Sequence, residues 1–123
     1  MTRYFSQEHE WIEIEGDLGT VGITDYAQGQ LGDITFVDLP AEGATFDKGD
    51  SVAVVDSVKA ASDVYTPVSG TIAEANDVLA DQPELVNTDA EVGGWLFRIT
   101  LSDASELEAL MDEAAYKDYV ESL

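Results

Sequence analysis

The segment that decides the fold of this chain spans residues 51–66 and reads SVAVVDSVKAASDVYT. Apolar and β-branched residues fill both of its ends, and such runs are typical of β-strands. Between them, the stretch from Asp56 to Asp63 reads nearly the same in both directions, with Lys59 at its centre. Two strands joined through small residues predict a β-hairpin that presents Lys59 at its tip.

Lys59 is isolated in charge, because no other basic residue occurs between Lys48 and Arg98. The neighbouring carboxylates of Asp56 and Asp63 favour an exposed, protonated amine. Schiff-base catalysis would instead need a buried amine or a nearby cation. We therefore interpret the hairpin as a structure that presents a lysine to another protein for modification.

Strand-like runs continue on both sides of this hairpin. Residues 11–15 and 20–23 flank a glycine-containing turn, which predicts a second hairpin. Further strands are expected at 34–39, 71–75 and 95–101. Many short strands at this spacing indicate a small sandwich or barrel, so the chain is predicted to be mainly β.

Helices are expected to be few. Thr24 can cap a short helix over 25–28, which Gly29 or Gly32 would stop. Residues 76–87 predict a loop with a helical turn.

The tail predicts a C-terminal helix over about 103–121, because it contains neither glycine nor proline from residue 102 onward. Asp103, followed three residues later by Glu106, has the spacing of a capping box. Two apolar stripes on this helix are slightly rotated from one another, which predicts a bend near Ala115. At 123 residues the chain suits a single domain, 1–123.

The charge balance limits the partners. The chain has 26 acidic and five basic residues, for a net charge of −21. Nucleic acids and anionic membranes would be repelled by such a surface. The acidity fits two causes equally well: a surface kept hydrated in a salt-adapted organism, or steering towards basic patches on partner proteins.

Residue types and segments that the sequence lacks exclude several kinds of site and several cellular locations. The sequence has no cysteine, which excludes disulfides, thiolate nucleophiles and zinc–cysteine sites. It has no signal-peptide run at its amino terminus and no apolar segment of the roughly 18 to 20 residues that a membrane span requires. We expect a soluble protein of the bacterial cytoplasm. The alternative is a processed mitochondrial protein, although Met1 favours the former.

No catalytic or metal site is predicted. His9 lies between Glu8 and Glu10, but this spacing matches no zinc signature, and a hydrogen-bonding role near a strand start is expected instead. Nothing in the sequence brings Ser57 and His9 together as members of a triad.

A series of motifs runs along the chain: Glu8-His9-Glu10-Trp11, 21–28, Leu31-Gly32-Asp33, 36–40, Ser57-Val58-Lys59-Ala60, 67–72, Asn76 with Leu79, Pro83 with Leu85 and Asn87, and Gly94-Trp95. Taken in order, these motifs resemble those of the glycine cleavage system H protein, a family of lipoate-bearing carriers. The order and spacing of the motifs are specific, although each alone is weak. One departure is Asp56, where the family usually has glutamate.

The resemblance implies a barrel-sandwich hybrid (lipoyl-domain-like) with short helices and a C-terminal helix. It also implies that Lys59 carries lipoic acid in amide linkage, as N6-lipoyllysine. Ser57, Val58 and Ala60 would be recognised by the lipoate-attaching enzymes. A tethered arm raises the effective concentration of its reactive end at each partner, with no catalysis by the carrier itself.

The partners implied are the other components of the glycine cleavage system. In the family, a pyridoxal-phosphate glycine decarboxylase (P-protein) loads the aminomethyl group of glycine onto the arm. A tetrahydrofolate-dependent aminomethyltransferase (T-protein) unloads it, and dihydrolipoamide dehydrogenase (L-protein) reoxidises the dithiol. The loaded arm folds against a cleft on the carrier, where acidic side chains engage its amine. The matching positions are Glu8, Glu10 and Asp63, and carboxylates suit this pairing.

Two alternatives stay open. A biotin carrier shares the fold and the hairpin lysine, but methionines usually flank that lysine, whereas Val58 and Ala60 flank it here. A lipoate or octanoate relay protein would pass acyl groups to other carriers from the same hairpin. The matches at Glu10 and Asp63 favour the glycine role, because a relay has no amine to shelter.

Overall fold

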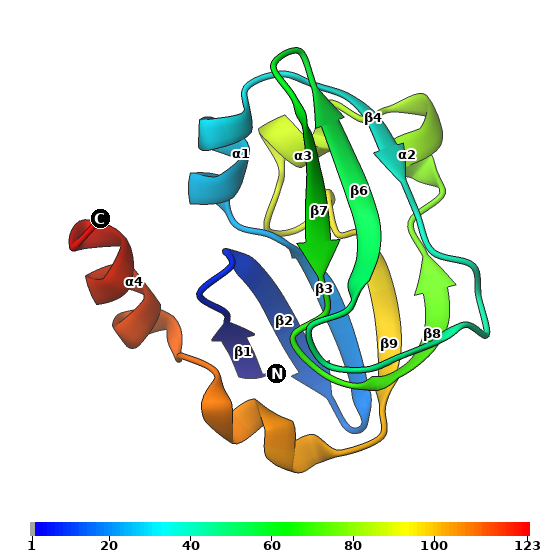
Figure 1. Cartoon of the computed structure of the whole chain (residues 1–123), viewed down its shortest axis with the longest axis vertical. Coiled ribbons are helices and arrows are strands. Elements are labelled where there is room, and N and C mark those ends of the chain that lie inside the picture. The colour runs from blue at the N-terminus through cyan, green and yellow to red at the C-terminus, as the bar shows by residue number, and fades with distance from the viewer. Residues whose placement is uncertain (1) are drawn as a thin grey trace.

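The computed structural model describes residues 2–123 and shows two antiparallel sheets (Figure 1). The larger sheet contains, in spatial order, β1 (Thr2–Phe5), β2 (Glu10–Glu15), β3 (Leu18–Ile23), β9 (Phe97–Leu101), β8 (Gly70–Ala75) and β5 (Thr45–Phe46). The smaller sheet contains β4 (Ile34–Asp38), β6 (Ser51–Ser57) and β7 (Ala61–Tyr65), with β6 in the middle. This arrangement confirms the predicted mainly β class.

The helices lie at the ends of the strands. They are α1 (Asp25–Leu31), α2 (Val78–Asp81), α3 (Leu85–Thr88), the 3₁₀ helix η1 (Ala104–Ala109) and α4 (Glu113–Glu121). In Figure 1, α4 lies at the edge of the molecule, on the side of the sheets that also carries α1. Among residues 2–123, no helix is long and apolar enough to span a membrane.

One apolar core joins the two sheets. Ile12 and Val21 of the larger sheet belong to the same buried cluster as Val55 and Val64 of the smaller one, and Phe97 closes it from β9. Each such side chain contributes about 1.5 to 3 kcal/mol on burial, so the sheets stabilise each other. The shared core is the reason that the chain forms a barrel-sandwich hybrid, as the resemblance implied.

The local signals in the first third of the chain are confirmed. The hairpin of β2 and β3 turns at Gly16, whose φ of 65° lies in the left-handed region that glycine adopts readily. Thr24 caps α1, because its Oγ1 accepts a hydrogen bond of 3.3 Å from the backbone N–H of Ala27. Of the two predicted stops, Gly32 is the one that ends the helix, with φ of 82°.

The tail corrects two expectations. Glu106 does not complete a capping box with Asp103; instead, its carboxylate accepts hydrogen bonds from Ser69, at 2.7 Å from the backbone nitrogen and 2.8 Å from Oγ. The helix is also interrupted earlier than Ala115. Met111 exchanges two backbone hydrogen bonds of 2.8 Å with Phe5, so the chain is extended between η1 and α4.

These corrections share a cause, which is pairing with distant segments. Ser69 and Phe5 offer partners that the tail's own sequence does not reveal, and tertiary contacts override local helix propensity. After the extended stretch, Asp112 caps α4 through the backbone N–H of Ala115 at 2.8 Å.

Replacing Gly70 with alanine should destabilise the fold, because a Cβ at this position would overlap the carbonyl oxygen of Thr100 on the paired strand β9. We expect Gly70→Ala to lower the free energy of unfolding by about 2 kcal/mol or more, measured by urea denaturation. Gly29→Ala is the matched control. It lies within α1 with nothing close to its Cβ position, and should raise stability by up to about 1 kcal/mol. Equal stability of both variants would contradict this packing of β8 on β9.

Candidate functional site

Lys59 lies in the turn that joins β6 to β7, at the tip predicted from the sequence. Ser57 fixes the backbone of this turn. Its Oγ accepts hydrogen bonds of 3.2 Å from the N–H groups of Lys59 and Ala60, and donates one of 3.1 Å to the carbonyl of Ala60. The tip is therefore ordered by a serine that the sequence indicated only as a recognition residue.

The tip is also tied to the segment that follows α1. The N–H of Val58 donates to the carbonyl of Asp33 at 3.0 Å, and the side chain of Val58 is 67% exposed. The side chain of Lys59 passes over Gly32, where a Cβ would stand 3.4 Å from Cε of the lysine. Within residues 2–123 the ion pairs involve only Arg3 and Arg98, so the Lys59 amine has no carboxylate partner.

A pocket of about 280 Å³ opens beside this hairpin, and we call it the carboxylate pocket. It has three walls: the loop before β2, helix α1 with the end of β3, and the strands of the Lys59 hairpin. The residues that line it are Glu8, His9 and Glu10; Ile23, Tyr26, Ala27, Gln30 and Leu31; and Val55, Ser62, Asp63 and Val64. The structure therefore brings together the three acidic residues Glu8, Glu10 and Asp63.

Glu10 is the buried carboxylate of the pocket, with an exposed fraction of 2%. Its Oε1 accepts a hydrogen bond of 2.7 Å from Ser6 Oγ, and its Oε2 accepts one of 3.2 Å from the backbone N–H of Tyr65. Burial raises the pKa of Glu10 to about 7, an effect that these two hydrogen bonds oppose and the charge of Glu8 reinforces. A cation in the pocket would stabilise the ionised form.

Glu8 and Asp63 are exposed and stand at the rim. Asp63 accepts a hydrogen bond of 3.1 Å from Ser51 Oγ, which holds its carboxylate across the hairpin. The three acidic residues thus differ in character, with one desolvated carboxylate inside and two hydrated ones at the opening. The sequence could not separate them, because in so acidic a chain each had the appearance of a surface residue.

His9 has the hydrogen-bonding role near a strand start that the sequence predicted, but its partner is distant. Its Nδ1 lies 2.9 Å from the hydroxyl of Tyr116 on α4, and its ring packs against Tyr26 at 4.7 Å between centroids. Burial lowers the pKa of His9, while the charge of Glu8 opposes this to a smaller extent. The lowered pKa favours the neutral form of the imidazole. Nothing in the local sequence around His9 indicates this distant partner.

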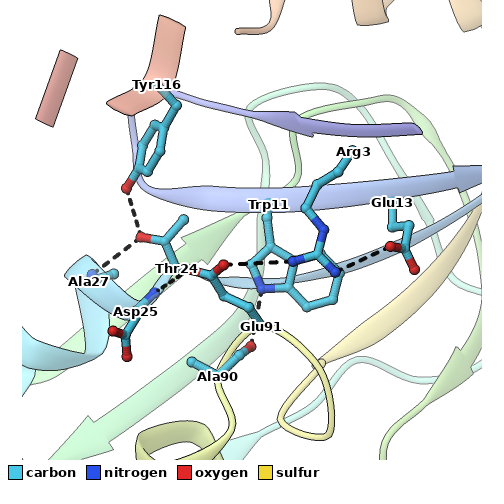
Figure 2. A network of polar contacts seen from close by, with 9 residues as sticks. All are labelled: Arg3, Trp11, Glu13, Thr24, Asp25, Ala27, Ala90, Glu91 and Tyr116. Atoms are coloured by element: carbon cyan, nitrogen blue, oxygen red, sulfur yellow. Dashed lines mark hydrogen bonds and ion pairs between the residues drawn. The ribbon is translucent and has the colours of Figure 1, made fainter. Parts of the chain in front are cut away.

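The beginning of α1 is fixed by a polar network that Figure 2 shows. Glu91 accepts a hydrogen bond of 2.8 Å from the N–H of Asp25 and pairs with Arg3 at 3.7 Å. Arg3 lies over the ring of Trp11 at 4.3 Å, and the indole donates to the carbonyl of Ala90 at 3.1 Å. This network attaches α1, one wall of the pocket, to the larger sheet.

A β-fold that presents an unpaired lysine at an ordered hairpin tip, next to a carboxylate pocket, defines a carrier domain for a lysine-linked group. Comparison with known proteins identifies the family. The family described as Glycine cleavage H-protein matches residues 3–123. The glycine cleavage system H protein of Bartonella quintana is 58% identical, over 95% of this chain and 96% of its own.

Two further relatives agree. The glycine cleavage system H protein of Escherichia coli O7:K1 is also 58% identical, over 95% of this chain and 92% of its own. The crystal structure of a glycine cleavage system H protein from Mycobacterium marinum has a TM-score of 0.89 at 35% identity, and covers 98% of this chain and 97% of its own. The chain therefore belongs to the glycine cleavage H-protein family. It is a carrier protein and not an enzyme.

Glu10 should make stability depend on pH. Its pKa rises from 4.5 to about 7 on folding, so its stabilising contribution is complete below pH 4.5 and is lost as the pH rises through 7. Glu10→Gln removes this loss. Relative to the wild type, the variant should gain roughly 2 to 3 kcal/mol in free energy of unfolding between pH 5 and pH 8, measured by urea denaturation.

Glu15→Gln serves as the control, because this glutamate is an exposed residue of the same strand. Its stability relative to the wild type should be nearly the same at both pH values. A Glu10→Gln difference that stays flat from pH 5 to pH 8 would show that the Glu10 carboxylate is not desolvated.

Proposed function

We propose that this chain is the lipoyl carrier that passes the aminomethyl group of glycine from the P-protein to the T-protein, with the L-protein reoxidising the dithiol. Membership of the glycine cleavage H-protein family supports the lipoyl carrier role. The observation that carries the finer assignment is the carboxylate pocket beside the Lys59 hairpin.

Lys59 suits covalent attachment of lipoic acid. Its amine is exposed and unpaired, so conversion to an amide breaks no ion pair within residues 2–123. The Ser57 hydrogen bonds hold the turn in one shape, and Val58 and Ala60 are exposed on either side for an attaching enzyme to recognise. When bound, the lipoyl group supplies a reducible disulfide at the end of a long flexible arm.

The carboxylate pocket suits the amine that the arm would bring. An ammonium group close to Glu10 would favour the ionised carboxylate and offset its desolvation, through a charge-assisted hydrogen bond. Glu8 and Asp63 at the rim add negative potential at the opening. A relay protein carries an acyl group without an amine and gains nothing from these three carboxylates. The pocket therefore favours the glycine role over the relay role.

The remaining assignments follow from the same carrier role. We assign residues 1–123 to one carrier domain, because the family match spans residues 3–123 and both sheets share one core. The net charge of −21 suits docking to basic surfaces on the P-, T- and L-proteins and on the lipoate-attaching enzymes. The bacterial relatives support a location in the bacterial cytoplasm.

Intact-mass and peptide analysis of protein from its native host should show one lipoyl adduct, at Lys59. Lys59→Arg should remove the adduct and abolish glycine–bicarbonate exchange reconstituted with the decarboxylase, while its thermal unfolding stays unchanged because the side chain is exposed. Lys48→Arg is the control and should keep both the adduct and the exchange. A biotin adduct, or a lipoyl adduct on Lys48 or Lys117, would contradict the assignment.

Glu10→Gln combined with Asp63→Asn should shorten the lifetime of the aminomethyl group on the arm. Loss of charge-assisted hydrogen bonds to the amine is expected to speed hydrolysis roughly tenfold or more. Water cleaves the carbon–sulfur bond in this hydrolysis and leaves the thiol, formaldehyde and ammonia, so formaldehyde release measures the rate. Glu15→Gln should leave the rate unchanged. Equal lifetimes in the double variant and the wild type would remove Glu10 and Asp63 from the site.

A further inference from the structure

Tyr116 lies on α4, outside the carboxylate pocket, yet its hydroxyl contacts two of the pocket's walls. It is 2.9 Å from Nδ1 of His9, in the loop wall, and 2.7 Å from Oγ1 of Thr24, which caps the α1 wall. Figure 2 shows the Tyr116 hydroxyl directed at Thr24, whose Oγ1 also accepts from Ala27. The ring is held independently, because it stacks on Phe5 at 4.7 Å.

The hydrogens available on Thr24, Tyr116 and His9 indicate which atom donates in each of their hydrogen bonds. Thr24 Oγ1 already accepts from the N–H of Ala27, so its own hydrogen is free to bond the oxygen of Tyr116. Burial raises the pKa of Tyr116, which keeps its hydroxyl protonated, and this hydrogen then bonds His9 Nδ1. If Tyr116 donated to Thr24 instead, the hydroxyl hydrogen of Thr24 would have no acceptor. The neutral imidazole therefore carries its proton on Nε2.

The backbone at His9 shows that the loop wall is under constraint. His9 has φ of 66°, and within residues 2–123 it is the only residue other than glycine with a positive φ. A conformation of this kind persists only where several contacts enforce it. Here they are the bonds from His9 N–H to the Ser6 carbonyl at 3.1 Å and from Thr24 N–H to the His9 carbonyl at 2.9 Å, with Tyr116 on the side chain.

The fixed backbone of His9 also fixes the position of the buried carboxylate, because Glu10 follows His9 in the chain. A shift of His9 would move the loop that carries Glu8 and Glu10 relative to α1, whose Tyr26 and Ala27 form the opposite wall. A change in the spacing of these walls would admit water to Glu10.

We propose that Tyr116 is a positioning residue for the carboxylate pocket, a clamp on α4 that joins the loop wall to the α1 wall and keeps the pocket closed around Glu10. Its effect on arm retention rests on the proposed function, whereas the clamp itself exists in the unmodified protein. The C-terminal helix thereby contributes to the site without entering it.

Tyr116→Phe tests the clamp in unlipoylated protein, because it removes the hydroxyl and retains the ring that stacks on Phe5. Nitrogen-15 NMR should show the Nε2–H tautomer of His9 in the wild type and a mixture of tautomers in the variant. Carbon-13 NMR should show the pKa of Glu10 falling from about 7 towards 4.5 as water enters. Tyr119→Phe is the control on the same helix, because its hydroxyl contacts neither His9 Nδ1 nor Thr24 and reaches the loop wall only at the Gln7 carbonyl, at 3.5 Å, the limit of a hydrogen bond.

The second measurement uses the protein with the aminomethyl group on its lipoyl arm, and it follows the rate of formaldehyde release. Tyr116→Phe should speed formaldehyde release about five- to tenfold, the effect of about one lost hydrogen bond, and Tyr119→Phe should not change it. An unchanged His9 tautomer with an unchanged Glu10 pKa would overturn the clamp. If both change and the lifetime does not, although the Glu10→Gln, Asp63→Asn variant shortens it, the clamp has no part in retention and the proposal fails.

Failure of the proposed function would look different. The wild type and the Glu10→Gln, Asp63→Asn variant would then release formaldehyde at the same rate. In that case the two NMR measurements on unlipoylated protein would still decide whether Tyr116 joins the walls.

Discussion

The apolar core shared by the two sheets sets the position of every residue at the site. Val64 of β7 is buried in that core, and side chains alternate between the faces of a strand, so its neighbour Asp63 is directed outward to the pocket rim. The same core holds Val55 on the partner strand β6. A register slip of one residue would bury Asp63 and expose Val64. The hydrophobic pattern of the hairpin therefore determines where its polar residues face.

Within this apolar surrounding, the Glu10 carboxylate lowers the stability of the fold. Keeping a carboxylate 2% exposed costs folding free energy at neutral pH, and apolar packing would avoid that cost. Proteins retain such groups where function requires them, at some loss of stability. Here Ser6 and Tyr65 provide only part of the compensation, and the remainder is available to a ligand that brings a positive charge. On the proposed function, the amine of the loaded arm would supply that charge.

Local sequence signals were sufficient to predict helix α1 and the hairpin that carries Lys59. Thr24 and Gly32 bound α1 as expected, and the near-symmetric segment around Lys59 forms the expected hairpin. Family motifs grouped Glu8, Glu10 and Asp63, and the structure places all three in one pocket, but the motifs did not indicate which of them is buried.

The contacts that sequence could not supply are those of the tail. Tyr116 meets Thr24 across 92 positions and His9 across 107 positions of the chain, and no periodicity within the tail encodes either partner. The same holds for Glu106, whose capping-box spacing is real but whose carboxylate bonds Ser69 instead. A residue does not form the hydrogen bonds of its local motif where a distant segment offers buried or better-aligned hydrogen-bond donors.

The backbone bridge between Phe5 and Met111 has a consequence for behaviour in solution. An unpaired strand edge can template association with another chain, and proteins limit this hazard by making edge strands short or covering them. The larger sheet ends in β5, of two residues, on one side and in β1, of four residues, on the other. The bridge occupies the last residue of β1, so neither edge offers a long run of free hydrogen-bonding groups. The tail thereby shortens the free edge of the larger sheet at β1, which leaves less of this edge for pairing with another chain.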